Sequence, residues 1–182
     1  GNTTTDILKN ADNAMYAAKT AGKNCWRFYT DQMQAAAQEK MALISSLHHV
    51  LAKQELSIAY QPIVEISTKQ IVSFEALLRW QSAEYGNVSP ARFIPLAEEC
   101  GLILPIGRWV LAEAARFARR LSAVGQDHVR IAVNISPPQL MDEDFVDYVA
   151  ICIASTGIRA EQLDLEITEG VLIEAMEENV AK

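Results

Sequence analysis

Residues 73–80 read SFEALLRW, and their composition fits two different structures. Glu, Ala, Leu and Arg favour helix, whereas the residues from Ile71 to Phe74 favour strand. On a helix, Glu75 and Arg79 would form an ordinary surface pair that contributes a few tenths of a kcal/mol. On a strand they would share one face, roughly 13 Å apart at about 3.3 Å per residue. The even-numbered residues would then form an apolar face behind them.

The segment just before this stretch decides between the two structures. LSIAYQPIVEI (56–66) contains alternating apolar residues, and the turn-like STKQ (67–70) separates it from IVSFEALLRW (71–80). Two strand-like runs joined by a short turn predict a β-hairpin. A helix at 73–80 would leave the first strand without its nearest partner and would scatter Phe74 and Trp80 over different faces. We therefore expect a strand at 71–80.

Beyond the hairpin, helix and strand signals alternate along the chain. The expected elements are helices at 95–99, 105–124 and 142–156, strands at 129–136 and 163–168, and a further helix that begins at 171. This alternation is typical of crossover connections and a parallel sheet.

The first 53 residues have a different organisation. Residues 5–21 form a predicted amphipathic helix with Thr5 as its cap and Gly22 as its stop, and CWRFYT (25–30) is a short strand candidate. Because these two elements are too small to bury a core, we expect them to be the tail of a domain that lies mostly upstream. A connecting helix is expected over residues 31–53, either as a spacer or as a signalling and dimerising helix.

Composition limits the class of function. The 182 residues are 50% hydrophobic and 21% charged, as in a globular protein, and the net charge of −7 without a basic stripe argues against a nucleic-acid partner. Cys25, Cys100 and Cys152 are far apart and odd in number, so we expect reduced thiols in a cytoplasmic protein rather than disulfides or zinc. No stretch approaches the roughly 20 apolar residues that a membrane span needs, so no membrane segment is expected.

Each of the later strands carries a polar side chain opposite its apolar face, because side chains alternate along a strand. Glu75 lies opposite the face of Leu78, which we expect to be packed, and Asn134 and Glu166 occupy the equivalent positions on their strands. A doubly wound sheet would bury both faces and make its strands apolar throughout. A barrel can instead direct polar side chains to its mouth, at the carboxyl ends of its strands.

We therefore expect an α/β barrel in which Glu75, Asn134 and Glu166 converge. Two carboxylates and one amide oxygen suit Mg²⁺, Mn²⁺ or Ca²⁺ rather than a soft metal. Arg79, on the face of Glu75, is suited to bind a phosphate through two hydrogen bonds. The same pattern is also compatible with hydrogen-bonded polar groups that bind no ligand, and the residues alone leave both interpretations open.

Five motifs occur in a fixed order from about Leu56 to the last residue: YQPIV, FEALLRW, FIPLAEECGLI, AVNISPPQL and LDLEITEG. Together they resemble the EAL-domain family of cyclic di-GMP phosphodiesterases. Separately, NADNAMYAAKTAGKN (10–24) resembles the closing helix of a GGDEF domain, the diguanylate cyclase module that often precedes an EAL domain. The resemblance implies a GGDEF remnant at 1–30, a linker helix at 31–53 and the N-terminal half of an EAL domain at 54–182.

This resemblance implies an incomplete TIM-like (β/α) barrel whose first strand is antiparallel. It also implies that Glu75, Asn134 and Glu166 are ligands of Mg²⁺ or Mn²⁺ and that Gln61 and Arg79 contact cyclic di-GMP. In this family, a metal-activated water attacks one phosphodiester of cyclic di-GMP and gives linear pGpG, with two metals holding the attacking and leaving oxygens.

The chain departs from the family in one respect. EAL enzymes supply further groups, notably an Asp-Asp pair on the next strand and then a lysine, a glutamate and a glutamine, whereas this chain ends at Lys182 and contains no Asp-Asp pair. We therefore expect a piece of a bacterial GGDEF–EAL signalling protein that is inactive by itself and self-associates through unpaired strand edges. The alternative is a degenerate EAL module that acts as a non-catalytic cyclic di-GMP receptor or as a protein-interaction scaffold.

Overall fold

The computed structural model describes residues 3–20, 22 and 24–167. The chain divides into two compact units, Gly1–Ser46 and Leu47–Lys182. Within the described residues, the helices are too short or too polar to cross a membrane.

The first unit begins with helix α1 (Thr4–Thr20), as the amphipathic pattern predicts. The predicted cap, Thr5, was wrong, because it lies inside the first turn. Thr3 caps the helix instead: its Oγ1 accepts a hydrogen bond from the Asp6 backbone N–H at 3.2 Å, and its own N–H donates to Asp6 Oδ2 at 2.9 Å. Gly22 has φ +105°, which is consistent with its predicted role as the helix stop.

The strand predicted for 25–30 is absent, and this segment is irregular. Trp26 and Phe28 contact each other edge to face at 4.9 Å, and each is 77% exposed. Aromatic composition indicated a strand, but a strand also needs a hydrogen-bonding partner, and the described residues pair none with this segment. Helix α2 (Asp31–Leu47) follows and ends earlier than the predicted residue 53, with turns up to Gln54.

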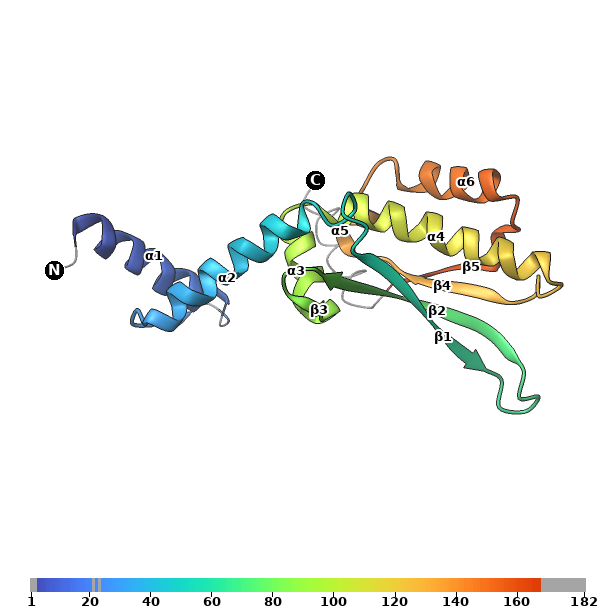
Figure 1. The fold of residues 1–182 in the computed structure, drawn as a ribbon, viewed down its shortest axis with the longest axis horizontal. Coiled ribbons are helices and arrows are strands. Elements are labelled where there is room, and N and C mark those ends of the chain that lie inside the picture. The colour runs from blue at the N-terminus through green and yellow to red at the C-terminus, as the bar shows by residue number, and fades with distance from the viewer. Residues whose placement is uncertain (1–2, 21, 23, 168–182) are drawn as a thin grey trace. The chain divides into compact units, whose positions relative to one another are not determined.

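The second unit is built on a sheet whose first two strands form the predicted hairpin (Figure 1). Its strands are β1 (Leu56–Val64), β2 (Ile71–Ser82), β3 (Gly86–Val88), β4 (Arg130–Asn134) and β5 (Leu163–Glu166). The strand order is β1-β2-β4-β5, and β3 pairs with the end of β2. Strand β1 is antiparallel to β2, whereas β2, β4 and β5 are parallel. Residues 73–80 are therefore strand, and the predicted antiparallel first strand is confirmed.

Helices α4 and α6 lie over one face of this sheet (Figure 1). Within its described residues, the second unit contains helices α3 (Pro90–Glu99), α4 (Ile103–Ala123), α5 (Pro137–Leu140) and α6 (Phe145–Thr156), with a 3-10 turn, η1, at Ala160–Gln162. The sequence did not predict β3 or α5. It placed the start of α3 too late and the start of α6 too early, and the helix expected from residue 171 lies outside the described residues.

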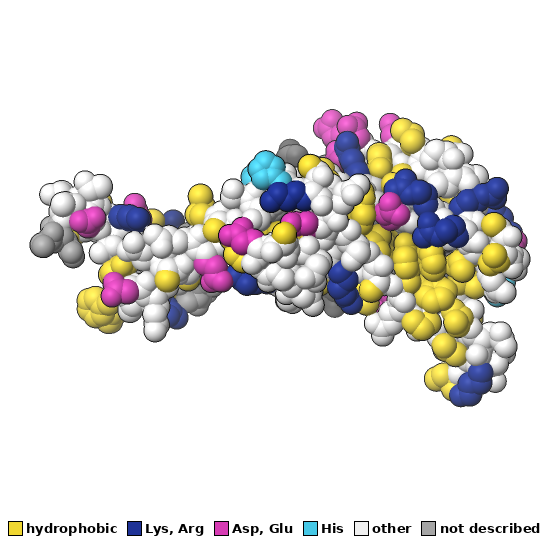
Figure 2. Space-filling model, in the orientation of Figure 1, with side chains coloured by type: hydrophobic (Ala, Val, Ile, Leu, Met, Phe, Trp, Pro, Cys, Tyr) yellow, Lys and Arg dark blue, Asp and Glu magenta, His cyan; other side chains and the backbone are white. Residues whose placement is uncertain are grey.

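The core lies between the sheet and α4. Ile131 and Val133 of β4 are almost fully buried there, opposite the alanine-rich face formed by Ala114, Ala115 and Ala118. Small side chains allow the helix to approach the sheet closely. The tip of the hairpin is different, because Ile63, Val64 and Ile66 are exposed, and Figure 2 shows apolar side chains gathered over this part of the surface.

Candidate functional site

Three polar side chains meet on the sheet face opposite α4. Glu75 of β2 is in register with Ala132 of β4, and Asn134 is two residues further along β4 on the same face. Asn134 is in turn in register with Glu166 of β5. The Asn134 Nδ2 donates a hydrogen bond to Glu75 Oε1 at 2.8 Å. The structure therefore brings all three predicted residues together on adjacent parallel strands.

The carboxyl ends of β4 and β5 fix this arrangement. Both strands end at the site residues, Asn134 and Glu166, and the Ile135 N–H extends the ladder by donating to the Glu166 carbonyl at 2.9 Å. Near the start of the same strands, Arg130 and Asp164 form an ion pair at 3.2 Å. The charge of Asp164 is thus paired with Arg130. Glu166 and Asn134 instead lie exposed at the strand ends, and Glu75 is half-buried.

Gln61 lies next to this group. It is in register with Glu75 across the β1–β2 hairpin, so the two side chains share a face, and Gln61 is exposed. Arg79 shares the face of Glu75 four residues further along β2, in register with Ser57. One guanidinium nitrogen of Arg79, Nη1, donates to the carbonyl of Leu78 at 3.0 Å. Gln61 therefore adjoins the Glu75 carboxylate, and Arg79 lies further along the strand.

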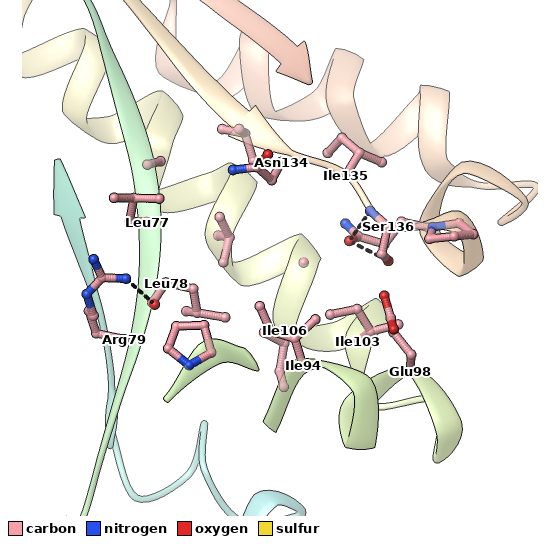
Figure 3. A pocket seen from close by; sticks show the side chains of 17 residues that line it. Leu77, Leu78, Arg79, Ile94, Glu98, Ile103, Ile106, Asn134, Ile135 and Ser136 are labelled. Carbon is pink, nitrogen blue, oxygen red and sulfur yellow. Dashed lines mark hydrogen bonds between the residues drawn. The ribbon is translucent and has the colours of Figure 1, made fainter. Parts of the chain in front are cut away.

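A largely apolar cavity of about 420 Å³ lies between β2, β4 and helices α3, α4 and α5. Figure 3 shows Leu78, Ile94, Ile103 and Ile106 directed toward its centre, whereas Arg79 points away from it. Leu78 lies on the face that was expected to be packed, but its side chain lines this cavity and is only half-buried. The pattern along β2 did not predict the cavity, because apolar residues that line a space and those that fill one follow the same alternation.

The donor atoms of the three-residue group fit a hard divalent cation. The group supplies two carboxylates and one amide, and the Asn134 amide can present its Oδ1 by turning about χ2. Such oxygen ligands suit Mg²⁺ or Mn²⁺ and do not suit a soft metal. In the described part of the chain, no three His, Cys, Asp or Glu side chains form a cluster that could hold a metal ion. Among the described residues, a metal site at this position would therefore combine the Asn134 amide with the two carboxylates.

Comparison with known proteins gives the family. The family model described as the EAL domain matches residues 44–182, about three quarters of the chain. The chain belongs to the EAL domain family.

Two curated relatives illustrate the similarity in sequence. The bifunctional diguanylate cyclase/cyclic di-GMP phosphodiesterase MucR of Pseudomonas aeruginosa is 39% identical over 169 residues, covering 93% of this chain and 25% of MucR. The cyclic di-GMP phosphodiesterase PdeR of Escherichia coli is 37% identical over 174 residues, covering 96% of this chain and 26% of PdeR. The EAL chain spans about a fifth to a quarter of the length of the curated relatives it matches.

A solved structure confirms the EAL fold. The PaMucR phosphodiesterase in complex with c-di-GMP superposes with a TM-score of 0.72 at 34% identity, over 77% of this chain and 57% of that chain. The described sheet, with parallel strands and an antiparallel first strand, is consistent with part of a (β/α) barrel.

Proposed function

We propose that the protein to which this sequence belongs is a metal-dependent phosphodiesterase that hydrolyses cyclic di-GMP to linear pGpG. The observation that carries this proposal is the convergence of Glu75, Asn134 and Glu166 at the ends of adjacent strands in an EAL-family chain. The names of MucR and PdeR, and the cyclic di-GMP bound in the PaMucR structure, support the same substrate.

In this proposal, Glu75, Asn134 and Glu166 bind Mg²⁺ or Mn²⁺. The Asn134 to Glu75 hydrogen bond keeps these two side chains side by side before the amide turns, and the β4–β5 register sets the spacing between Asn134 and Glu166. When bound there, Mg²⁺ or Mn²⁺ would supply Lewis-acid chemistry: it would lower the pKa of a coordinated water and neutralise charge on the phosphate. Because Mg²⁺ prefers about six oxygen ligands, the three side chains would supply only part of its ligand set.

Arg79 and Gln61 contact the dinucleotide in this proposal. A guanidinium has five N–H donors, and the bond to the Leu78 carbonyl engages one nitrogen of Arg79. The other edge of the guanidinium, formed by Nε and Nη2, is suited to donate two hydrogen bonds to two oxygens of one phosphate. Gln61 lies beside Glu75, where its amide can hold a substrate oxygen close to the metal ligands.

We further propose a GGDEF–EAL signalling protein in the cytoplasm, with the GGDEF remnant at 1–30, the linker helix at 31–53 and the EAL part from 54 onward. The match to MucR supports it, because that match covers 93% of the chain and so includes residues before the start of the EAL model at residue 44. The cytoplasmic part of the proposal rests on the odd number and wide spacing of the three cysteines, which favour reduced thiols.

For residues 1–182 alone, we propose self-association without turnover. Strands β1 and β5 are the outermost strands of the described sheet, and unpaired edges recruit other chains. The exposed apolar side chains at the hairpin tip add to this tendency. Sedimentation of these residues as a compact monomer, or production of pGpG by them, would refute this part of the proposal.

The main test measures pGpG formation by the full-length protein with Mn²⁺ or Mg²⁺. Glu75→Gln should reduce turnover by more than about 100-fold, since even changes outside the metal ligands typically cost 10–100-fold. Glu143→Gln, which alters an exposed carboxylate at the start of the α6 region, is the matched control and should leave turnover unchanged. Normal turnover by Glu75→Gln would refute the metal role. Binding of cyclic di-GMP without pGpG formation by the wild type would favour the receptor alternative.

A further inference from the structure

Helices α4 and α5 approach each other closely at Gly107. A Cβ atom placed on Gly107 would lie 2.1 Å from Gln139 Nε2 and 2.5 Å from Gln139 Cδ, far inside van der Waals contact. The Gln139 side chain is only 5% exposed, so it is enclosed at this point. Any side chain at position 107 would therefore displace Gln139.

Gln139 in turn holds the turn that follows β4. Its Oε1 accepts hydrogen bonds from the Ser136 backbone N–H at 3.2 Å and from the Ser136 Oγ at 3.0 Å, drawn as dashed lines in Figure 3. Ser136 is two residues beyond Asn134. Between them, the Ile135 N–H donates to the Glu166 carbonyl. The segment 134–136 is thus held by β5 on one side and by Gln139 on the other.

Arg108, the residue after Gly107 on α4, attaches the segment that follows α5 to α4. Arg108 Nη2 binds Asp142 Oδ2 at 2.9 Å, and the Tyr148 hydroxyl donates to the Arg108 carbonyl at 2.9 Å. Within the turn, the Asp142 N–H donates to the Gln139 carbonyl at 3.2 Å. These attachments oppose a movement of α5 as a unit that would relieve a clash with position 107. A displaced Gln139 side chain must instead disturb Ser136.

We propose that Gly107 and Gln139 are positioning residues for Asn134. The absence of a side chain at 107 lets Gln139 fix Ser136, and this fixes where the end of β4 presents the Asn134 amide to Glu75. The inference rests on the proposed metal site. Neither residue touches the metal-binding group; both act through the backbone of 134–136.

The test is Mn²⁺ affinity of the full-length protein, measured by titration with electron paramagnetic resonance detection, together with thermal unfolding. Gly107→Ala should weaken Mn²⁺ binding by about 10–100-fold, as changes behind the metal ligands typically do. Gln139→Ala shortens the side chain that faces Gly107 and so introduces no clash. It therefore tests the proposal even if Gly107→Ala does not fold. It should also weaken binding, because Ser136 loses its acceptor.

The double variant sharpens the test. Once Gln139→Ala has removed the clashing atoms, adding Gly107→Ala should change Mn²⁺ affinity by less than about twofold, because residues that act through one shared contact do not have additive effects. Gly125→Ala is the matched control at the other end of α4: its φ is +81°, and a Cβ there meets nothing within 4 Å. It should lower the unfolding temperature, because alanine is strained in that conformation, and leave Mn²⁺ affinity unchanged.

The outcomes separate this inference from the proposed function. If the wild type fails to bind Mn²⁺, the metal site and the inference are both refuted. If the wild type binds but folded Gly107→Ala or Gln139→Ala binds equally well, only the positioning role is refuted. The positioning role would also be refuted if the loss of Mn²⁺ affinity in the double variant equalled the product of the losses in the two single variants. It would be refuted as well if Gly125→Ala lost Mn²⁺ affinity in proportion to its loss of stability.

Discussion

The two faces of one sheet are used for different purposes. On the face toward α4, Ile131 is 0% exposed and Val133 and Ala76 are almost as deeply buried. On the opposite face of the same strands, Glu75 and Asn134 meet through a hydrogen bond in a half-buried to exposed setting. Because adjacent residues point to opposite faces, substitutions one position apart should affect stability in one case and ligand binding in the other.

Ile131→Ala should produce the largest loss of stability. It removes a fully enclosed side chain from the layer between the sheet and α4 and leaves a cavity, which costs about 2–5 kcal/mol in the free energy of unfolding. Denaturant unfolding measures this loss. Ile151→Ala on α6, where the side chain is 61% exposed, is the control and should change stability by no more than about 0.5 kcal/mol. Equal losses would show that the two positions do not differ as their burial implies.

Glu55→Ala should have the next largest effect. Glu55 Oε2 accepts a hydrogen bond at 2.9 Å from Nε1 of Trp80, which is fully buried on the face toward α4, and Oε1 accepts one from the Ala83 N–H at 3.1 Å. Removing the carboxylate leaves the indole N–H without this acceptor, at about 1–3 kcal/mol. In a Trp80→Phe background, which lacks the donor, the same change should cost less. An unchanged cost in that background would exclude the indole hydrogen bond as the cause.

The contribution of Glu55 should depend on pH. The hydrogen bond from Trp80, with a smaller contribution from the Ala83 N–H, holds the pKa of Glu55 below its usual value of 4.5, even though burial opposes this shift. A lowered pKa in the folded protein means that the stabilisation is fully present above the usual pKa and is lost as the pH falls through the lowered value. The stability difference between wild type and Glu55→Ala should therefore shrink in acid. A difference that stays constant from neutral to acidic pH would contradict this.

Leu78→Ala should have a smaller effect than Ile131→Ala, although both residues lie on the face toward α4. Leu78 lines the cavity of about 420 Å³, so fewer atoms surround it. We expect a loss of about 1–2 kcal/mol, below the range for enclosed leucines. The same denaturant measurement on both variants tests this. A loss as large as that of Ile131→Ala would mean that the cavity is closed in solution.

The hairpin and the candidate site were predictable because both depend on alternation along strands. Four turn residues between two alternating runs indicated the hairpin, and the polar residues opposite the apolar faces of three strands indicated Glu75, Asn134 and Glu166 as the candidate site. The hydrogen bond that joins Glu75 to Asn134 spans 59 positions. This hydrogen bond depends on the parallel pairing of β2 with β4. The sequence indicated that pairing only indirectly, because helices and strands alternate along the chain.

Short elements and contacts between distant residues were not predictable. Strand β3 and helix α5 have only three and four residues, too few to show a period. The contact between Gly107 and Gln139 depends on how α4 lies against α5. The end of α2 at Leu47 has no glycine or proline to mark it, and Gln54 takes a left-handed φ of +56° instead.

The most direct test of the metal site is Mn²⁺ titration of the full-length protein carrying Glu75→Gln, combined with its free energy of unfolding. Glu75 lies on the face opposite α4, so Gln should preserve stability to within about 0.5 kcal/mol. Mn²⁺ affinity should fall by more than about 100-fold, because a metal ligand is lost rather than a residue behind one. A Glu75→Gln protein that binds Mn²⁺ as tightly as the wild type would contradict the account.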